Sequence, residues 1–146
     1  MKIIVVDTRQ QDGRHALKDA YFEEHGVKTV RSKLIVGDYA RIDNQTVSVD
    51  TKRNILELAG NICGKQHERF RNECIRARDC GIKLIILIEE IPPDNDLSKW
   101  KSKRTQVSGE TLGKAMKTMT EKYGVQFEFC AVDATAKRII DILFEE

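Results

Sequence analysis

The chain has 146 residues, of which 40% are hydrophobic and 33% are charged, and its formal net charge is +2 at pH 7. This length fits a single domain over residues 1–146 that is long enough to bury a core, and the composition excludes a disordered chain. So small a net charge excludes a generally polybasic protein, although it leaves room for a local basic surface.

No targeting or membrane-spanning segment is predicted. The apolar run near the start of the chain, IIVV, is interrupted by Asp7, so it is too short for a signal peptide. No later apolar run approaches transmembrane length. We therefore expect an intracellular, cytoplasmic protein with no membrane partner.

The first half of the chain is predicted to contain both strands and helices. KIIVVD is typical of a buried strand, and Gln11 to His25 has apolar residues at helical spacing and ends at Gly26. Two further helices are expected over roughly Asn54–Cys63 and Gln66–Cys80. Between these parts lie three strand-like runs, around Val27–Val30, Lys33–Ile42 and Thr46–Lys52.

The second half continues the alternation. IKLIILIEE is a continuous apolar run between turn signals, which predicts a central strand buried on both faces. IPPDNDLSKWKSKRTQ has no periodicity and is predicted to be a long loop. Ser108 to Tyr123 is expected to be helical, VQFEFCAV to be a strand, and Asp133 to cap a final helix. Strands interleaved with helices predict an α/β fold with a mixed sheet.

The cysteines favour free thiols over a metal site. None of the four forms a CxxC pair, and a cluster of Cys63, His67, Cys74 and Cys80 has a spacing that matches no common zinc pattern. We expect free cysteines in a reducing compartment.

Two runs around Asp43-Asn44-Gln45 are typical of a β-hairpin. With this loop, paired residue numbers sum to 88, which places Asp38 directly opposite Asp50. Like charges in this position destabilise a sheet, and a divalent cation would remove the repulsion. Asp50 and Lys52 share the polar face of their strand, whereas Val49 faces the core. A register shift of one residue would separate the acids, and an ordinary exposed hairpin is the alternative.

The order VDTR (Val6–Arg9), GDY (Gly37–Tyr39), VDTK (Val49–Lys52) and LIILIEE (Leu84–Glu90) resembles the nuclease domain of the XPF/Hef family of structure-specific DNA endonucleases. This family is a branch of the PD-(D/E)xK superfamily. The resemblance covers nearly the whole chain. It implies a restriction-endonuclease-like α/β fold, in which helices flank a central mixed β-sheet.

The resemblance also implies a catalytic centre. Asp38 and Asp7 match the family's acids, and Asp50 stands where the family usually has glutamate, a position at which the wider superfamily accepts either acid. The three aspartates are the expected ligands of Mg²⁺, or of Mn²⁺ as a substitute. The backbone carbonyl of Thr51 is a further expected ligand. Lys52 matches the catalytic lysine that orients or polarises water.

Three positions depart from the family pattern. Gln10 replaces a glutamate, and Thr51 replaces an arginine, at a position that the superfamily leaves free. A later family acid should fall at Leu56, and the nearest carboxylate is Glu57, one residue late. The pattern leaves open whether Glu57 substitutes.

Candidate DNA contacts lie in three places. Arg9 matches a family arginine that contacts phosphate or joins a local network. Gln66 and Arg69 belong to a helix that follows the catalytic triplet, and its arginines contact phosphates or form a solvated face balanced by acids. The loop SKWKSKR supplies cations around an aromatic ring that stacks on an unpaired base or packs against the body of the protein. Its candidates are Lys99, Trp100, Lys101, Lys103 and Arg104.

The function expected from these features is metal-dependent hydrolysis of branched or flapped DNA in recombination or repair. A catalytically inactive DNA-binding or dimerisation subunit of a nuclease complex is the alternative. A small-ligand α/β protein lacks support, because the chain has no glycine-rich phosphate loop. The resemblance implies a homodimer. Because a chain of this length leaves no room for a helix-hairpin-helix or helicase module, it also implies a DNA-targeting protein partner.

Overall fold

The computed structural model describes residues 1–10 and 15–145. Its strands are β1 (Ile3–Val6), β2 (Lys28–Arg31), β3 (Tyr39–Arg41), β4 (Val47–Lys52), β5 (Lys83–Ile88) and β6 (Gln126–Phe129). Its α-helices are α1 (Ala16–Glu24), α2 (Ile55–Cys63), α3 (His67–Asp79), α4 (Gly109–Tyr123) and α5 (Thr135–Phe144). Three short 3₁₀ turns are η1 (Pro93–Asn95), η2 (Leu97–Lys99) and η3 (Val132–Ala134).

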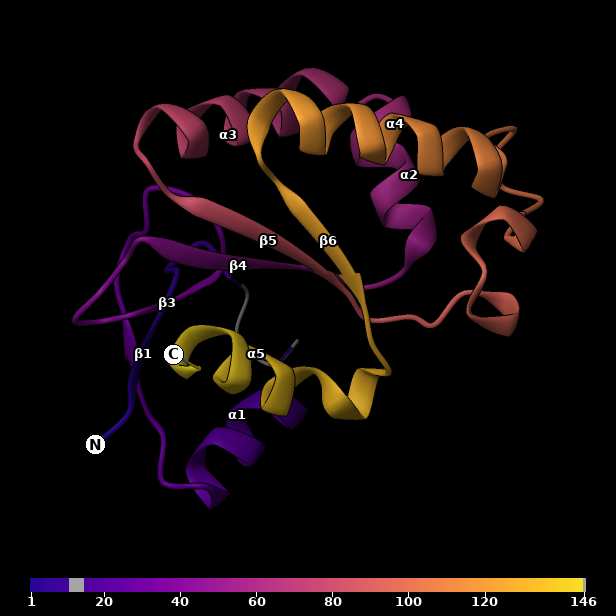
Figure 1. Cartoon of the computed structure of the whole chain (residues 1–146). Helices are drawn as coiled ribbons and strands as arrows, with labels where there is room; N and C mark the ends of the chain where they lie inside the picture. The colour runs from indigo at the N-terminus through magenta and orange to yellow at the C-terminus, as the bar shows by residue number, and fades with distance from the viewer. Residues whose placement is uncertain (11–14, 146) are drawn as a thin grey trace.

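The strands form one mixed sheet in the order β2-β1-β3-β4-β5-β6. β3 is antiparallel to both of its neighbours, β1 and β4, while the other neighbouring pairs are parallel. Helices α2, α3 and α4 cover one face of the sheet, and α1 and α5 cover the other (Figure 1). The predicted α/β fold with a central mixed sheet flanked by helices is confirmed.

The central strand β5 is buried on both faces, as its apolar run predicts. Leu84, Ile86 and Ile88 pack in the core beneath α2, α3 and α4, whereas Leu87 packs in the core with α1 and α5. Alternating side chains therefore fill two cores, which explains why the run shows no polar alternation.

The hairpin has the predicted register. Tyr39 pairs with Val49 and Ala40 pairs with Ser48, so both pairs sum to 88. Asp38 lies one residue before β3, and its N–H donates to the carbonyl of Val49 at 2.8 Å. The acids are therefore brought together from the end of one strand and the interior of the next.

Several expected boundaries are corrected. The strand expected over Lys33–Ile42 is limited to β3, because the segment before it bends at residues 35–38. Asp133 belongs to η3 and makes no capping hydrogen bond, and α5 begins at Thr135. The predicted start of the first helix, residues 11–14, lies outside the described residues.

The remaining sequence expectations concern thiols and membranes. All four cysteines are free: Cys74 and Cys130 are buried, and Cys63 and Cys80 are exposed. Over the residues that the structure describes, no helix combines the length and apolar character needed to cross a bilayer.

Candidate active site

Asp38 is held at the edge of β4 by a glycine turn. Gly37 has φ +79°, and a Cβ at this position would collide with the hydroxyl of Ser48. The turn directs Asp38 to the end of the neighbouring strand, where its Oδ2 accepts hydrogen bonds from the Thr51 N–H at 2.9 Å and the Thr51 hydroxyl at 3.0 Å. Only glycine combines this backbone conformation with so close a neighbour.

Asp50 and Lys52 lie beneath α3. The Lys52 ammonium is 3.1 Å from Asp50 Oδ2 and 5.3 Å from the centroid of the Phe70 ring. The ion pair is close but is not aligned as a hydrogen bond, so Asp50 Oδ2 has no hydrogen-bond partner among the described residues. A helix covers this polar face of the strand, and Asp50 is only 7% exposed.

Burial and like charge shape the protonation of this pair of acids. Burial raises the pKa of Asp38 well above its ordinary value, and the negative charge of Asp50 raises it further. Burial acts to lower the pKa of Lys52, but Asp50 outweighs it, and the pKa of Lys52 lies above its ordinary value. The lysine thus remains a cation beside two carboxylates that repel each other.

The donor set of Asp38 and Asp50 fits a divalent cation. Both supply hard oxygen atoms, their mutual repulsion favours a bound positive charge, and Asp50 Oδ2 is buried without a hydrogen bond. Among the described residues, no three His, Cys, Asp or Glu side chains are already grouped as a metal site. These two carboxylates would therefore be the first protein ligands of a bound cation.

Asp7 directly follows β1 and anchors the loop that precedes Asp38. Its two oxygens accept bonds from the Arg9 side chain, at 2.7 and 3.3 Å, and from the N–H groups of Arg9 and Leu34. Burial acts to raise the pKa of Asp7, but these hydrogen bonds outweigh it, and the pKa lies below its ordinary value. Asp7 lines the same cavity as Asp38 and Asp50, and its role as a third metal ligand stays a prediction.

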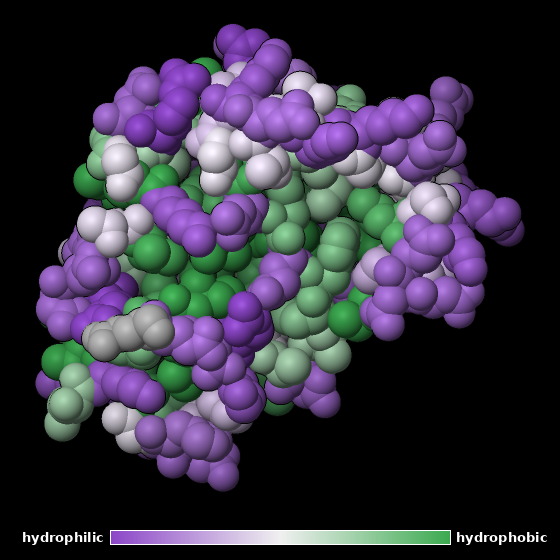
Figure 2. Space-filling view, in the orientation of Figure 1, coloured by the Kyte–Doolittle hydropathy of each residue, from purple (hydrophilic) through white to green (hydrophobic). Residues whose placement is uncertain are grey.

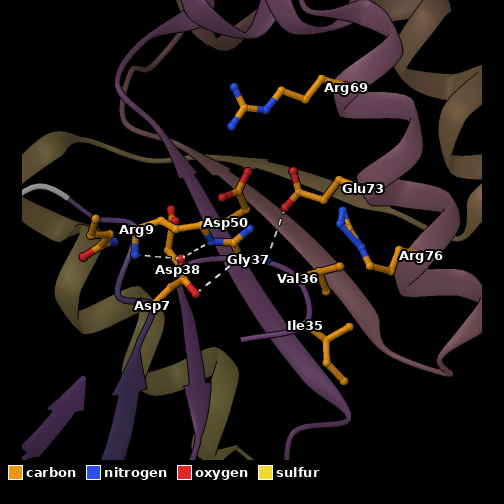
Figure 3. A pocket seen from close by; sticks show the side chains of 11 residues that line it. Asp7, Arg9, Ile35, Val36, Gly37, Asp38, Asp50, Arg69, Glu73 and Arg76 are labelled. Atoms are coloured by element: carbon orange, nitrogen blue, oxygen red, sulfur yellow. Dashed lines mark hydrogen bonds and ion pairs between the residues drawn. The ribbon is translucent and has the colours of Figure 1, made fainter. Parts of the chain in front are cut away.

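Glu73 is a site residue that the sequence reasoning missed. It projects from α3 into a cavity of about 200 Å³ lined by Asp38 and Asp50, and its Oε1 accepts the Gly37 N–H at 3.2 Å (Figure 3). Burial raises its pKa to about 7, with a further contribution from Asp50. The available signal was its spacing from Arg69 and Arg76, which lie on the same helix face.

The departures around α2 have structural explanations. Leu56 is half-buried and packs against the core. Glu57 lies at the start of α2, where its N–H donates to the capping side chain of Asn54 at 2.8 Å. The carboxylate of Glu57 borders a neighbouring cavity of about 620 Å³, together with Asp38 and Thr51, but it does not border the cavity that holds Asp50.

The two acids that follow β5 are engaged in structural contacts. Glu89 forms an ion pair with Lys18 at 2.7 Å, and both side chains are 7% exposed. Glu90 accepts the Ile55 N–H at 2.8 Å and so holds the first turn of α2. The acidic end of LIILIEE thus joins β5 to a helix on each face of the sheet.

Three of the predicted DNA contacts lie at the site. Arg9 and Arg69 line the cavity of Asp38 and Asp50, and Arg76 joins them. Gln66 borders an adjoining cavity of about 310 Å³ with Asp50, Lys52 and Arg69. Basic and amide groups therefore surround an acidic floor, an arrangement that suits a phosphate brought to a cation.

The charged loop is not part of these cavities. Lys99, Lys101, Lys103 and Arg104 are exposed on the segment after β5, and Lys99 pairs with Asp94 at 3.2 Å. Trp100 is only 7% exposed and packs in the core beneath α2, α3 and α4. Of the two readings that the sequence left open for Trp100, the structure shows the ring packed against the body of the protein, where it anchors its loop.

Comparisons with known proteins agree with this architecture. The ERCC4 domain matches residues 6–142. Two solved structures of XPF from Aeropyrum pernix, one of them in complex with DNA, superpose with TM-scores of 0.71 and 0.73 at 20% and 19% sequence identity. They cover 97% and 98% of this chain, which spans 63% and 64% of theirs. No curated protein sequence matches. At these identities the superpositions establish a shared fold.

Proposed function

The chain belongs to the ERCC4 domain family, and on this premise we propose that it is a metal-dependent endonuclease that hydrolyses phosphodiester bonds in branched or flapped DNA. The observation that carries the proposal is the arrangement of Asp38, Asp50 and Lys52 at two adjoining cavities, both of which are bordered by Arg69. Two acids that repel each other, a half-buried lysine and a cationic border suit a phosphate approaching a metal ion.

The proposed cofactor is Mg²⁺, with Mn²⁺ as a substitute, held by Asp38 and Asp50 and completed by Asp7 or the Thr51 carbonyl. Once bound, such an ion polarises the scissile phosphate and lowers the pKa of a bound water. Lys52, fixed beside Asp50 and over Phe70, holds the water or stabilises negative charge on the phosphate.

The neighbouring residues orient this machinery. The N–H and hydroxyl of Thr51 fix one oxygen of Asp38, and this leaves the other oxygen for the cation. Arg9 is held by Asp7 and borders the cavity, where it contacts a phosphate of the substrate. Arg69 and Arg76, on α3, contact the phosphate backbone of the DNA. DNA as the substrate is also consistent with the fold shared with an XPF that was solved with DNA.

A catalytically inactive DNA-binding or dimerisation subunit is the second candidate. It is favoured by the absence of the later family acid, because Leu56 is half-buried against the core and Glu57 borders a different cavity. The active nuclease is favoured by the retained acids and lysine, because bringing these charged side chains together out of water costs free energy of folding.

We also propose that the protein forms a homodimer and works with a DNA-targeting protein. β6 lies at an edge of the sheet, and Phe127 and Phe129 on it are half-buried. In Figure 2, apolar residues gather over the region of β5 and β6, between the two layers of helices. A second copy of the chain would cover this surface and the strand edge. Sedimentation equilibrium at several concentrations tests the homodimer.

Cleavage of labelled flap, splayed-arm and four-way-junction DNA tests the activity. Wild type, Asp38→Asn and Lys52→Ala are compared with Mg²⁺ or Mn²⁺, and Asp43→Asn is the matched control, because Asp43 is exposed in the loop of the same hairpin. We expect cation-dependent nicking by wild type and by Asp43→Asn, and a loss of at least about 100-fold in the other two variants.

The same experiment separates the two candidates. DNA binding without cleavage, under either cation and with each substrate, would support the inactive subunit. Cleavage that survives in Asp38→Asn and Lys52→Ala would mean that the hydrolytic centre lies elsewhere or belongs to a contaminant.

A further inference from the structure

Helix α3 presents three charged residues to the cavity. Arg69, Glu73 and Arg76 are four and three residues apart, so they lie on one helix face, and all three line the cavity that holds Asp38 and Asp50. Figure 3 shows the carboxylate of Glu73 facing the side of the cavity on which Asp50 lies, between the two arginines. On the proposed function, this face of α3 contacts the phosphates of the substrate. The same face therefore also carries an acid, Glu73, that faces the loop before Asp38.

Glu73 contributes a hydrogen bond from a helix to this loop, residues 34–38. Leu34 donates its N–H to Asp7, the carbonyl of Val36 accepts from the Ser48 hydroxyl at 2.7 Å, and Asp38 donates its N–H to Val49. The Gly37 N–H is bound by Glu73, at 3.2 Å. Gly37 is buried, so without Glu73 its N–H would have to move or stay unpaired.

The contact also crosses between two distant parts of the chain. The bonds from Asp7, Ser48 and Val49 tie the loop to the sheet, whereas the bond from Glu73 ties it to a helix. Asp38 follows Gly37 directly, so a displacement of the Gly37 peptide is transmitted to the carboxylate of Asp38.

We propose that Glu73 is a positioning residue that couples the DNA-facing helix α3 to the metal-binding carboxylate of Asp38, through its hydrogen bond with the Gly37 N–H. This inference rests on the proposed function. Arg69 and Arg76 hold α3 against the DNA backbone of the substrate. Through its hydrogen bond with Gly37, Glu73 then fixes the position of the residue before Asp38 relative to α3. For this role the side chain at position 73 must supply a hydrogen-bond acceptor to the Gly37 N–H. A glutamine supplies one and an alanine does not.

Two variants of Glu73 and one matched control test the proposal. Glu73→Gln keeps the acceptor and removes the charge, Glu73→Ala removes both, and Glu68→Gln removes a charge from an exposed position on the same helix. Three quantities are measured: hydrogen exchange of the Gly37 amide by NMR, Mn²⁺ affinity by calorimetry, and kcat and KM for a flap substrate.

We expect Glu73→Ala to accelerate exchange of the Gly37 amide by about 10-fold or more. It should weaken Mn²⁺ binding by about 10–100-fold, as the loss of an outer-shell partner does. It should lower kcat by about 100-fold with little change in KM, because Asp38 is misplaced while the arginines remain. Glu73→Gln should keep Gly37 protected and lower kcat only about threefold, and Glu68→Gln should match wild type.

Two results would overturn the proposal. If Glu73→Gln damages Mn²⁺ binding and kcat as severely as Glu73→Ala while Gly37 stays protected, the charge of Glu73 acts on the reaction directly. If Gly37 exchanges equally fast in all variants, the contact does not position the loop. A wild type that neither binds Mn²⁺ nor cleaves DNA would refute the proposed function, and Gly37 exchange would still report whether Glu73 holds the loop.

Discussion

Replacing Glu73 with glutamine is expected to stabilise the metal-free protein at pH 8 and to have little effect at pH 5. Burial raises the pKa of Glu73 from an ordinary value of 4.5 to about 7, with a further contribution from Asp50. A raised carboxyl pKa means that the folded state disfavours the ionised form. The stability associated with protonated Glu73 is therefore fully present below pH 4.5 and is lost as the pH rises through about 7.

The magnitude follows from the size of the shift. The difference between about 7 and 4.5 corresponds to up to about 3 kcal/mol of lost stability at pH 8, at about 1.4 kcal/mol for each pKa unit. At pH 5 the carboxyl is largely protonated in the folded state, and the same relation leaves less than about 1 kcal/mol. For a chain of this length, the larger value corresponds to a rise in Tm of up to roughly 10 °C.

Differential scanning calorimetry in chelator, from pH 5 to pH 8, measures this effect. Glu68→Gln, an exposed position on the same helix, is the control and should show no pH-dependent gain. Saturating Mn²⁺ should reduce the advantage of Glu73→Gln, because a bound cation offsets the local negative charge. Equal Tm values for wild type and Glu73→Gln at pH 8, or an equal gain at pH 5, would refute the assignment of Glu73 as a buried, charge-disfavoured acid.

Three other substitutions test the packing and the charges. Gly37→Ala should lower the free energy of unfolding by about 2–4 kcal/mol in urea titrations and abolish cleavage, because the new Cβ combines a positive φ with a collision. Its control is Gly26→Ala, at φ +71° in open space, which should lower the free energy of unfolding by only about 1 kcal/mol. Lys18→Ala should lower the free energy of unfolding by about 3–5 kcal/mol, because it leaves Glu89 buried without its partner. Arg69→Ala should weaken binding to flap DNA and reduce the salt slope of log K by about 1 in anisotropy titrations.

Exposed positions supply the remaining controls. Lys137 pairs with Asp141 at the surface, so Lys137→Ala should lower the free energy of unfolding by less than about 1 kcal/mol. Lys117→Ala, on the exposed face of α4, should leave the salt slope unchanged. Equal losses for Lys18→Ala and Lys137→Ala would contradict the buried ion pair, and equal slopes for Arg69→Ala and Lys117→Ala would contradict phosphate contact by Arg69.

The hairpin and the central strand were predictable from the sequence because their signals are local. The turn around Asn44, whose side chain accepts bonds from the N–H and hydroxyl of Thr46, sets the register of the two strands. That register brings Asp38 beside β4. The apolar run of β5 identifies a strand buried on both faces, since strand periodicity depends only on neighbouring residues.

The position of α3 was not predictable in this way. Period and charge show which residues share a face of the helix, but they do not show what that face covers. Glu73 therefore looked like a solvated counter-charge, whereas in the structure its carboxylate accepts a hydrogen bond from the Gly37 N–H beside Asp38 and Asp50. For the same reason the sequence left open whether Trp100, which stands among cations, contacts DNA or packs against the protein, and the structure places it in the core.

The sequence by itself indicated the strands without all of their bounds, most of the helices and the register of the hairpin, because these follow from residue type and from spacing over a few positions. The resemblance to a nuclease family then singled out the acids and the lysine as candidates. Only the tertiary structure decided that a helix covers Asp50 and Lys52, that Glu73 joins them, and that Glu57 borders another cavity. These contacts join residues far apart in the chain, and their geometry depends on how whole helices pack on the sheet.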